Sequence, residues 1–243
     1  MTIDEERDYH FRYVLEDNFG NRRTYQFIVK GKRQDIPEYK PEANEMLYWN
    51  RTNVIQKPGM ELVVPRYYVY EDVPLRTDMR GDSSHIAFDY ILDAGRTPIH
   101  SYCDLSIGLR HMPVADTTKY YIVQKAGKWR SSMGGKYANG WIKTRVRSLG
   151  TFSVDVDTIA PQITPIGQGG WRTSRNIRFR IKDMESGIGS YKVYIDGKFV
   201  LFGLKKGILV IQNPEKVKKG VSHKLEVTVT DQCGNMTRKE YKF

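Results

Sequence analysis

The sequence has few of the residues that build metal clusters, disulfide frameworks or membrane spans. Its 243 residues contain two cysteines, Cys103 and Cys233, so it has no cysteine pattern for a metal centre. We expect two free thiols, with a disulfide between them as the alternative. No apolar run approaches the roughly 20 residues of a membrane-spanning helix, and no transmembrane segment is predicted. Apolar residues also lack a sustained helical period, which excludes a helix bundle.

Histidines are scattered singly and form neither a His-x-His nor a His-Glu-x-x-His motif. One partial match exists, because His85 and Asp89 have the His-x-x-x-Asp spacing of some zinc peptidases. A strand is predicted over residues 85–91, and two positions four residues apart on a strand lie about 13 Å from each other, too far to share one ion. We therefore expect no catalytic residue, no metal and no cofactor. A zinc-dependent hydrolase using His85 and Asp89 is the alternative.

Acidic residues are too few to balance the basic ones: 39 Lys and Arg face 28 Asp and Glu, for a net charge of +11. Most basic residues alternate with apolar ones, as over residues 177–182, which is typical of the solvated face of half-buried strands. The dense lysine blocks lie in predicted loops without interleaved aromatics, at Lys198, Lys205 and Lys206 and at Lys216, Lys218 and Lys219. No nucleic-acid partner is expected. Adhesion to an anionic surface and a basic nucleic-acid-binding β-protein are the alternatives.

Residues that favour strands are abundant. Aromatic residues make up 12% of the chain, with sixteen Tyr, and the 21 Gly and ten Pro are distributed over many turns. This composition, with short alternating apolar runs between turns, predicts an all-β fold of tandem antiparallel β-sandwich domains.

One motif occurs near both ends of the chain. Asp17-Asn18-Phe19-Gly20-Asn21 and Asp231-Gln232-Cys233-Gly234-Asn235 each follow an apolar alternation and precede more strand-forming residues. Gly accepts a positive φ, and Asp and Asn bind their own backbone, so each motif predicts a closing hairpin. Residues 1–31 are accordingly interpreted as the last hairpin of a truncated immunoglobulin-like domain. The polar N-terminus is no signal peptide, and the sequence does not establish whether Met1 is the true start.

The remaining boundaries follow from proline and turn signals. Residues 32–43 are predicted to be a linker, residues 44–156 a middle β-sandwich domain, and residues 157–243 an immunoglobulin-like domain. Asp196-Gly197 is the strongest hairpin signal in the last domain, where seven short strands are expected.

Two candidate ligand sites remain in the turns and tryptophans. A calcium site built from Asp183, Glu185 and either Asp196 or Asp231 is one alternative, but we expect solvated turn carboxylates. Trp129, Trp141 and Trp171 are candidates for a carbohydrate-stacking surface, but tryptophan in a β-sandwich more often lies in the core, and a core role is expected.

Four motifs in order carry a resemblance: Asp157-Thr158-Ile159-Ala160-Pro161, Asp183-x-x-Ser186-Gly187-Ile188, Tyr194-Ile195-Asp196-Gly197 and Val229-Thr230-Asp231-x-x-Gly234-Asn235. The chain resembles the non-catalytic C-terminal immunoglobulin-like region of the lysostaphin-like zinc metallopeptidases, peptidoglycan endopeptidases that Bacteroidetes-type bacteria export to the cell envelope. The resemblance covers essentially the whole chain.

The resemblance implies a non-catalytic accessory and spacer module that binds the cell envelope or a glycan. It implies as partners an upstream catalytic domain of the same parent protein and a cell-wall or surface glycan, and a periplasmic or extracellular location. The zinc core of the family includes His-x-His, which this chain lacks, so we expect that it is not an enzyme.

Overall fold

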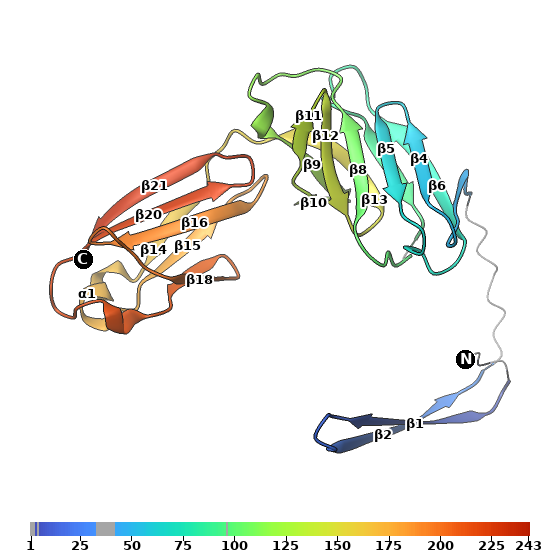
Figure 1. The fold of residues 1–243 in the computed structure, drawn as a ribbon, viewed down its shortest axis with the longest axis horizontal. Coiled ribbons are helices and arrows are strands. Elements are labelled where there is room, and N and C mark those ends of the chain that lie inside the picture. The colour runs from blue at the N-terminus through green and yellow to red at the C-terminus, as the bar shows by residue number, and fades with distance from the viewer. Residues whose placement is uncertain (1–2, 4, 33–41, 96) are drawn as a thin grey trace. The chain divides into compact units, whose positions relative to one another are not determined.

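The computed structural model describes residues 3, 5–32, 42–95 and 97–243. Strands make up 52% of the chain and helices 6%, which confirms the predicted all-β fold of tandem antiparallel sandwiches. The chain divides into two compact units, Met1–Lys40 and Pro41–Phe243, coloured from blue to red along the chain in Figure 1. None of the helices in the described residues is long and apolar enough to cross a membrane. The predicted linker falls almost entirely outside the described residues.

The first unit contains a two-stranded antiparallel hairpin of β1 (Asp8–Glu16) and β2 (Arg22–Lys30). Its register pairs Asp8 with Lys30 at one end and Glu16 with Arg22 at the turn. Successive side chains of a strand point to opposite faces. One face of this hairpin therefore carries the aromatic positions, and the other carries mostly charged and polar residues.

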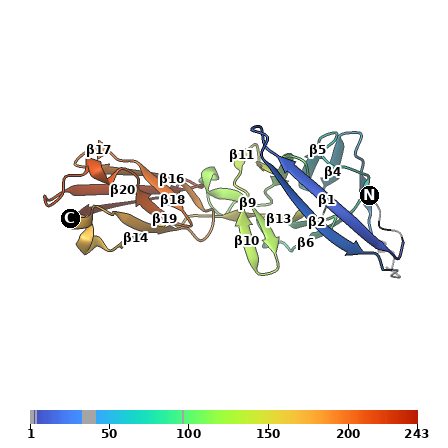
Figure 2. The ribbon, with the colours of Figure 1, turned by 90° about the horizontal axis from the view of Figure 1, so that it is seen from below.

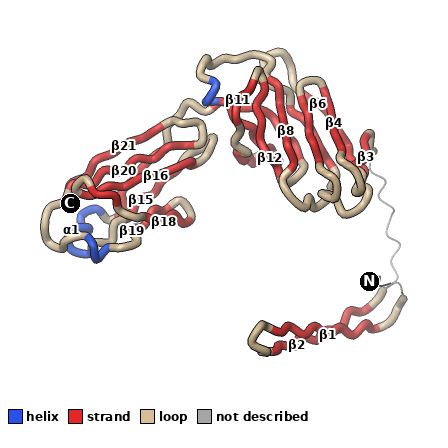
Figure 3. Tube along the Cα trace, viewed as in Figure 1, coloured by secondary structure: helices blue, strands red, loops and turns tan. Residues whose placement is uncertain are grey.

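The second unit begins with a sandwich of two antiparallel sheets, whose strands are coloured red in Figure 3. One sheet has the order β10-β9-β13-β7-β6-β3 and the other β11-β12-β8-β5-β4. The strands are β3 (Glu45–Leu47), β4 (Asn53–Lys57), β5 (Met60–Val64), β6 (Val73–Arg80), β7 (Asp89–Asp93), β8 (Cys103–Gly108), β9 (Tyr120–Ala126), β10 (Trp129–Ser132), β11 (Lys136–Ala138), β12 (Trp141–Val146) and β13 (Gly150–Val156). The short turn η1 (Thr117–Lys119) precedes β9.

The core of this sandwich follows from the alternation of its strands. Leu62 of β5 and Leu105 of β8 pair across the sheet and are both 0% exposed, and the large rings of Tyr90 and Phe152 are equally buried. Burying one such side chain contributes about 1.5–3 kcal/mol. The predicted strand over 85–91 is wrong in its first half, because the chain bends over residues 85–87 and β7 begins only at Asp89.

The last sandwich has the immunoglobulin topology. Its sheets have the orders β14-β15-β19-β18 and β17-β16-β20-β21, which correspond to strands A-B-E-D and C′-C-F-G, and Figure 2 shows β16 and β14 in separate layers. The strands are β14 (Gln162–Ile166), β15 (Arg178–Lys182), β16 (Ile188–Ile195), β17 (Lys198–Phe199), β18 (Phe202–Lys205), β19 (Ile208–Ile211), β20 (Lys224–Asp231) and β21 (Met236–Lys242). The prediction that the last domain is immunoglobulin-like is confirmed, with one more strand than the seven expected.

A short helical segment closes one end of this sandwich. It consists of the 3-10 helix η2 (Gln168–Gly170) and the helix α1 (Trp171–Ser174). Another 3-10 helix, η3 (Pro214–Lys216), precedes the loop to β20. α1 places Trp171 in the core, where its ring centroid lies 5.1 Å from that of Phe179. The indole N–H donates a hydrogen bond to the carbonyl oxygen of Ile166 at 3.0 Å, so the polar atom of this buried ring is satisfied.

Candidate functional site

The three tryptophans considered as a candidate ligand surface do not share one. Trp171 is 0% exposed, so it has the expected core role and does not belong to such a surface. Trp129 is 81% exposed at the start of β10, whereas Trp141 is half-buried on β12 in the other sheet. Trp141 packs over the backbone of Gly108, and only Trp129 offers an open ring face.

His85 and Asp89 are engaged with different partners. His85 Nδ1 lies 2.9 Å from Asp82 Oδ1, and Asp89 Oδ1 accepts a hydrogen bond from Lys125 Nζ at 2.6 Å. Within the described part of the chain, neither residue belongs to a group of three or more side chains that could hold a metal ion. The strand argument against a zinc site fails because residues 85–88 do not form a strand, yet these pairings oppose the site for a different reason.

Three carboxylates meet at the start of the last sandwich. Oxygen atoms of Asp157, Asp183 and Asp231 all lie within 4.8 Å of one another. Asp157 is 0% exposed and Asp231 is 4% exposed, so the prediction of solvated turn carboxylates is wrong for Asp231. The candidate calcium site of the sequence contained Asp183 with either Asp231 or Asp196, but not Asp157, which opens one of the four motifs that carry the resemblance. Among the described residues, neither Glu185 nor Asp196 belongs to the group.

Each carboxylate fixes a turn. Asp157 Oδ2 accepts hydrogen bonds from the backbone N–H of Ser186 at 3.0 Å and from its hydroxyl. Asp231 Oδ1 accepts from the N–H groups of Cys233 and Asn235, both at 2.8 Å. Asp183 Oδ1 accepts from the N–H of Gly187 at 2.7 Å. Buried N–H groups that lose such an acceptor are costly, so the carboxylates determine the local backbone.

The electrostatics of the cluster favour a bound cation or proton. Burial raises the pKa of Asp231, and the neighbouring carboxylates of Asp157 and Asp183 raise it further, against the lowering effect of hydrogen bonds from Asn235. Ca²⁺ binds carboxylate oxygens at 2.3–2.6 Å, so two ligands of one ion lie at most about 5 Å apart. The oxygen spacing of these three residues fits that limit, and an all-oxygen donor set suits Ca²⁺ rather than zinc.

The same region joins the two sandwiches. Lys119 Nζ donates to the carbonyl oxygen of Cys233 at 3.0 Å, and the hydroxyl of Tyr121 donates to Glu185 Oε2 at 3.2 Å. The side-chain amide of Asn235 donates to the carbonyl oxygen of Asp157 at 3.0 Å. Tyr121, Val123 and Cys233 form a small buried apolar cluster beside these bonds. Side chains of the middle sandwich and turns of the last one are thus in direct contact.

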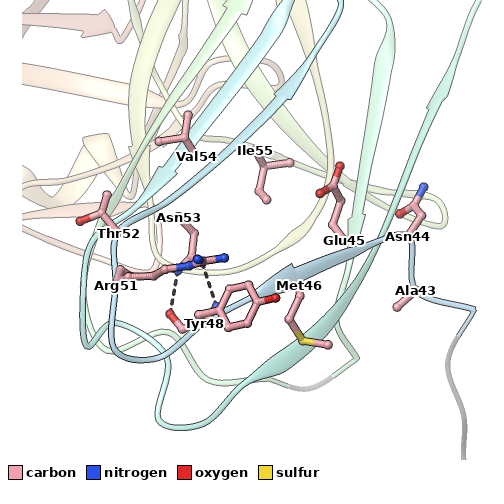
Figure 4. Close-up of a pocket in the computed structure, with 10 residues that line it drawn as sticks. All are labelled: Ala43, Asn44, Glu45, Met46, Tyr48, Arg51, Thr52, Asn53, Val54 and Ile55. Carbon is pink, nitrogen blue, oxygen red and sulfur yellow. Dashed lines mark hydrogen bonds between the residues drawn. The ribbon is translucent and has the colours of Figure 1, made fainter.

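A polar hollow of about 660 Å³ lies at the edge of the middle sandwich, beside β3 and β4 (Figure 4). The Arg51 guanidinium stacks on the Tyr48 ring, 3.7 Å from its centroid. The Asn53 side chain both accepts from and donates to the backbone of Tyr48 at 2.8 Å. The charged residues that line the hollow are both engaged, because Glu45 pairs with Lys57 at 3.0 Å and Arg51 stacks on Tyr48. The described lining therefore presents no activated acid, base or nucleophile.

Comparison with known protein families gives a match for the middle sandwich. Residues 44–157 are similar to the Zu5-like domain, and this range contains all strands from β3 to β13. No curated protein matches the chain. The similarity concerns the middle sandwich, which is less than half of the chain.

Proposed function

We propose that the chain is a non-catalytic accessory and spacer module of an exported peptidoglycan metallopeptidase, and that it docks on the cell envelope or a glycan there. In this proposal it acts outside the cytoplasm, next to an upstream catalytic domain of the same parent protein. The observation that supports a spacer most directly is the junction between the two sandwiches, where Lys119 and Tyr121 donate hydrogen bonds to turns of the last sandwich and Asn235 donates to the Asp157 carbonyl.

A spacer needs a junction that resists bending. Domains joined only by a linker move freely by default, but here Asp157, the residue directly after β13, is buried and hydrogen-bonded to Ser186 of the last sandwich. Lys119 and Tyr121 of the middle sandwich contact the turns that the aspartates fix. Bending the junction would break these bonds together and expose the apolar cluster around Tyr121.

The N-terminal hairpin supports a modular array. Its turn repeats the atomic arrangement of the β20–β21 turn: Asp17 Oδ1 accepts from the N–H groups of Phe19 and Asn21, both at 2.9 Å. The Asn21 amide donates to Asp17 Oδ2 at 2.8 Å, as Asn235 does to Asp231 Oδ2 at 2.7 Å. Gly20 and Gly234 have φ of 82° and 79°. We propose that β1–β2 is the closing hairpin of another immunoglobulin-like domain.

The faces of the two hairpins agree with this proposal. Counting back from the turn, Tyr13 and Leu15 occupy the positions of Val227 and Val229. Val227 and Val229 are 0% exposed in the core of the last sandwich, whereas Tyr13 and Leu15 are 55% and 60% exposed. A two-stranded hairpin is marginal in water, so a covering sheet from the parent protein accounts for this apolar face.

The spacer proposal is tested by measuring a distance across the junction in the full chain. Spin labels on cysteines introduced at the exposed positions Thr52 and Lys205 report one distance between the sandwiches. We expect a single narrow distribution in the otherwise unchanged protein and a broad one in the double variant Lys119→Met/Tyr121→Phe. The matched control is Tyr120→Phe/Lys125→Met, which removes bonds made to Val114 and Asp89 inside the middle sandwich. Equally broad distributions in all three proteins would refute a rigid spacer.

The docking part has its own test. Purified peptidoglycan sacculi are sedimented with the full chain, and the fraction of protein in the pellet is measured at increasing salt. Retention that a Trp129→Ala variant reduces would assign the exposed ring as a contact. Recovery of all the protein in the supernatant at low salt would remove glycan docking and leave the spacer role.

A further inference from the structure

A cavity of about 880 Å³ opens at one end of the last sandwich. Its walls are the β16–β17 turn, the residues after β17, and the loop from η3 to β20. Ligand pockets for small molecules typically enclose about 300–1,000 Å³. The cavity therefore has room for a small molecule or for one segment of a larger one.

The cavity is lined by large apolar side chains that remain open to solvent. Phe199, Leu201 and Val221 are 62%, 53% and 43% exposed. Ile195 and Val217 belong to the buried core of the domain and line the same hollow. Single exposed apolar residues are common, but a group of them around one concave site is typical of a binding surface.

The polar part of the lining is cationic. Lys198, Lys216 and Lys218 line the cavity and are exposed, and none of them forms an ion pair with a carboxylate of the described residues. The lining acid Asp196 is already engaged, since Oδ2 lies 2.6 Å from His223 Nδ1 and Oδ1 accepts from the Lys224 N–H at 2.9 Å. The cavity thus combines an apolar surface with unbalanced positive charge.

The walls are held in place by hydrogen bonds. His223 Nε2 lies 2.8 Å from the carbonyl oxygen of Lys218, so the buried imidazole ties the lysine-bearing loop to the Asp196 turn. On the other side, the Val200 N–H donates to the Val193 carbonyl and the Gln212 N–H donates to the Leu201 carbonyl, both at 3.0 Å. A preformed cavity avoids part of the ordering cost of binding.

We propose that this cavity binds a monomeric anionic amphiphile, an alkyl chain that carries a phosphate or carboxylate group. The alkyl part of the ligand covers Phe199, Leu201 and Val221, and its anionic group contacts Lys198, Lys216 and Lys218. Lys198 lies in strand β17, not in the loop that the sequence predicts, whereas Lys216 ends η3 and Lys218 follows it. Folding thus brings lysines from two separate segments to one cavity that Phe199 also lines. This proposal is independent of the spacer role.

The full chain is titrated by calorimetry with decyl phosphate below its micelle concentration, with decanol, and with inorganic phosphate. Decyl phosphate is expected to bind at one site, at least about tenfold more tightly than either of the others, because each of them provides only one half of the interaction. Its affinity is expected to fall as salt increases. Equal affinities for decyl phosphate and decanol, or for decyl phosphate and inorganic phosphate, would overturn the proposal.

Charge-reversal variants locate the site. Lys216→Glu/Lys218→Glu is expected to weaken decyl phosphate binding by about tenfold or more. Lys205→Glu/Lys206→Glu changes the net charge by the same amount on exposed residues outside the cavity and is expected to change the affinity less than about twofold. Leu201→Ser is expected to weaken decyl phosphate binding and leave phosphate binding unchanged. Equal losses in both charge variants would overturn the site.

Vesicles separate a cavity from a membrane-adhesive surface. Phosphatidylcholine vesicles with and without phosphatidylglycerol are sedimented with the wild-type chain and with each of the two charge-reversal variants. Binding to the anionic vesicles without any binding of decyl phosphate would overturn the cavity proposal and assign the lysines to a surface. Inhibition of vesicle binding by decyl phosphate would support it, because both ligands then use one site.

Discussion

The Nδ1 atom of His223 lies 2.6 Å from Oδ2 of Asp196, and this contact holds a buried imidazole against an exposed turn. The other ring nitrogen, Nε2, lies 2.8 Å from the carbonyl oxygen of Lys218. A carbonyl oxygen only accepts hydrogen bonds, so Nε2 carries a proton. A carboxylate also accepts, and the arrangement is best satisfied when both nitrogens are protonated.

This contact makes the stability of the last sandwich depend on pH. Burial lowers the pKa of His223, but the hydrogen bonds with Asp196 and Lys218 raise it more, so the pKa lies above the ordinary 6.5. A pKa raised in the folded state gives stability that is fully present below pH 6.5 and is lost as pH rises through the folded-state pKa. We expect the urea midpoint to fall from pH 6 to pH 8.5, and His223→Gln to remove most of this fall. A parallel pH dependence in both proteins would contradict this role.

Asp157, at the junction between the two sandwiches, is expected to contribute strongly to stability. Asp157→Ala removes the acceptor for the N–H and hydroxyl of Ser186, which is itself 0% exposed. Buried donors without a partner cost about 1–3 kcal/mol each, so we expect a loss of about 3 kcal/mol in the free energy of unfolding. Chemical denaturation measures it.

The control for Asp157 is another aspartate that accepts from a turn. Asp93→Ala removes an exposed bond to the Gly95 N–H and should cost less than about 0.5 kcal/mol. Similar losses in both variants would show that the buried position of Asp157 has no special effect.

Calcium is expected to stabilise the chain through the carboxylates of Asp157, Asp183 and Asp231. Their oxygens lie within 4.8 Å of one another. Burial, and after it the repulsion from the neighbouring carboxylates, raises the pKa of Asp231, and a bound cation would offset both effects. When an ion binds only the folded state and its free concentration is 100 times its dissociation constant, it stabilises that state by about 2.7 kcal/mol. Thermal unfolding in EDTA and in increasing CaCl₂ measures the effect.

Asp183→Asn is the diagnostic variant for calcium. It keeps an oxygen acceptor for the Gly187 N–H but removes one negative charge, and it should abolish most of the calcium-dependent rise in melting temperature. A melting temperature that CaCl₂ and EDTA leave unchanged in the wild-type chain would contradict a calcium site and leave the cluster as a turn-fixing device.

The thiols of Cys103 and Cys233 are expected to react slowly. Both side chains are buried and free, and burial raises the pKa of each thiol to about 11. At pH 8 only about one thiol in a thousand is then ionised, and the thiolate is the nucleophile. Mass spectrometry should find both cysteines unmodified by iodoacetamide in the native chain and both modified in urea. A disulfide-linked native form would contradict two separate thiols.

The sequence predicts local features well and contacts between distant segments poorly. The alternation of Leu225, Val227 and Val229 predicts a half-buried strand, and Asp17 and Asn21 predict their turn, because both follow from neighbours along the chain. The four-residue helix that directs Trp171 into the core is too short to give a periodic signal in the sequence. Asp157 was missed because its partners Ser186 and Asn235 come from two later turns, and nothing in a linear pattern brings those turns together.

The two equivalent turns provide a last prediction, since the same substitution should have unequal effects. Asp231→Ala removes the acceptor for Cys233 and Asn235 in a hairpin whose inner face is the core of the last sandwich. It should lower the free energy of unfolding by about 2–3 kcal/mol. Asp17→Ala breaks the corresponding bonds to Phe19 and Asn21 in an exposed two-stranded hairpin, which belongs to a separate compact unit. It should leave the main thermal transition within about 1 °C of the wild-type value. Because the turn chemistry is the same, a comparable shift in both variants would mean that the hairpin unfolds together with the sandwiches, and the proposal that it completes a different domain would fail.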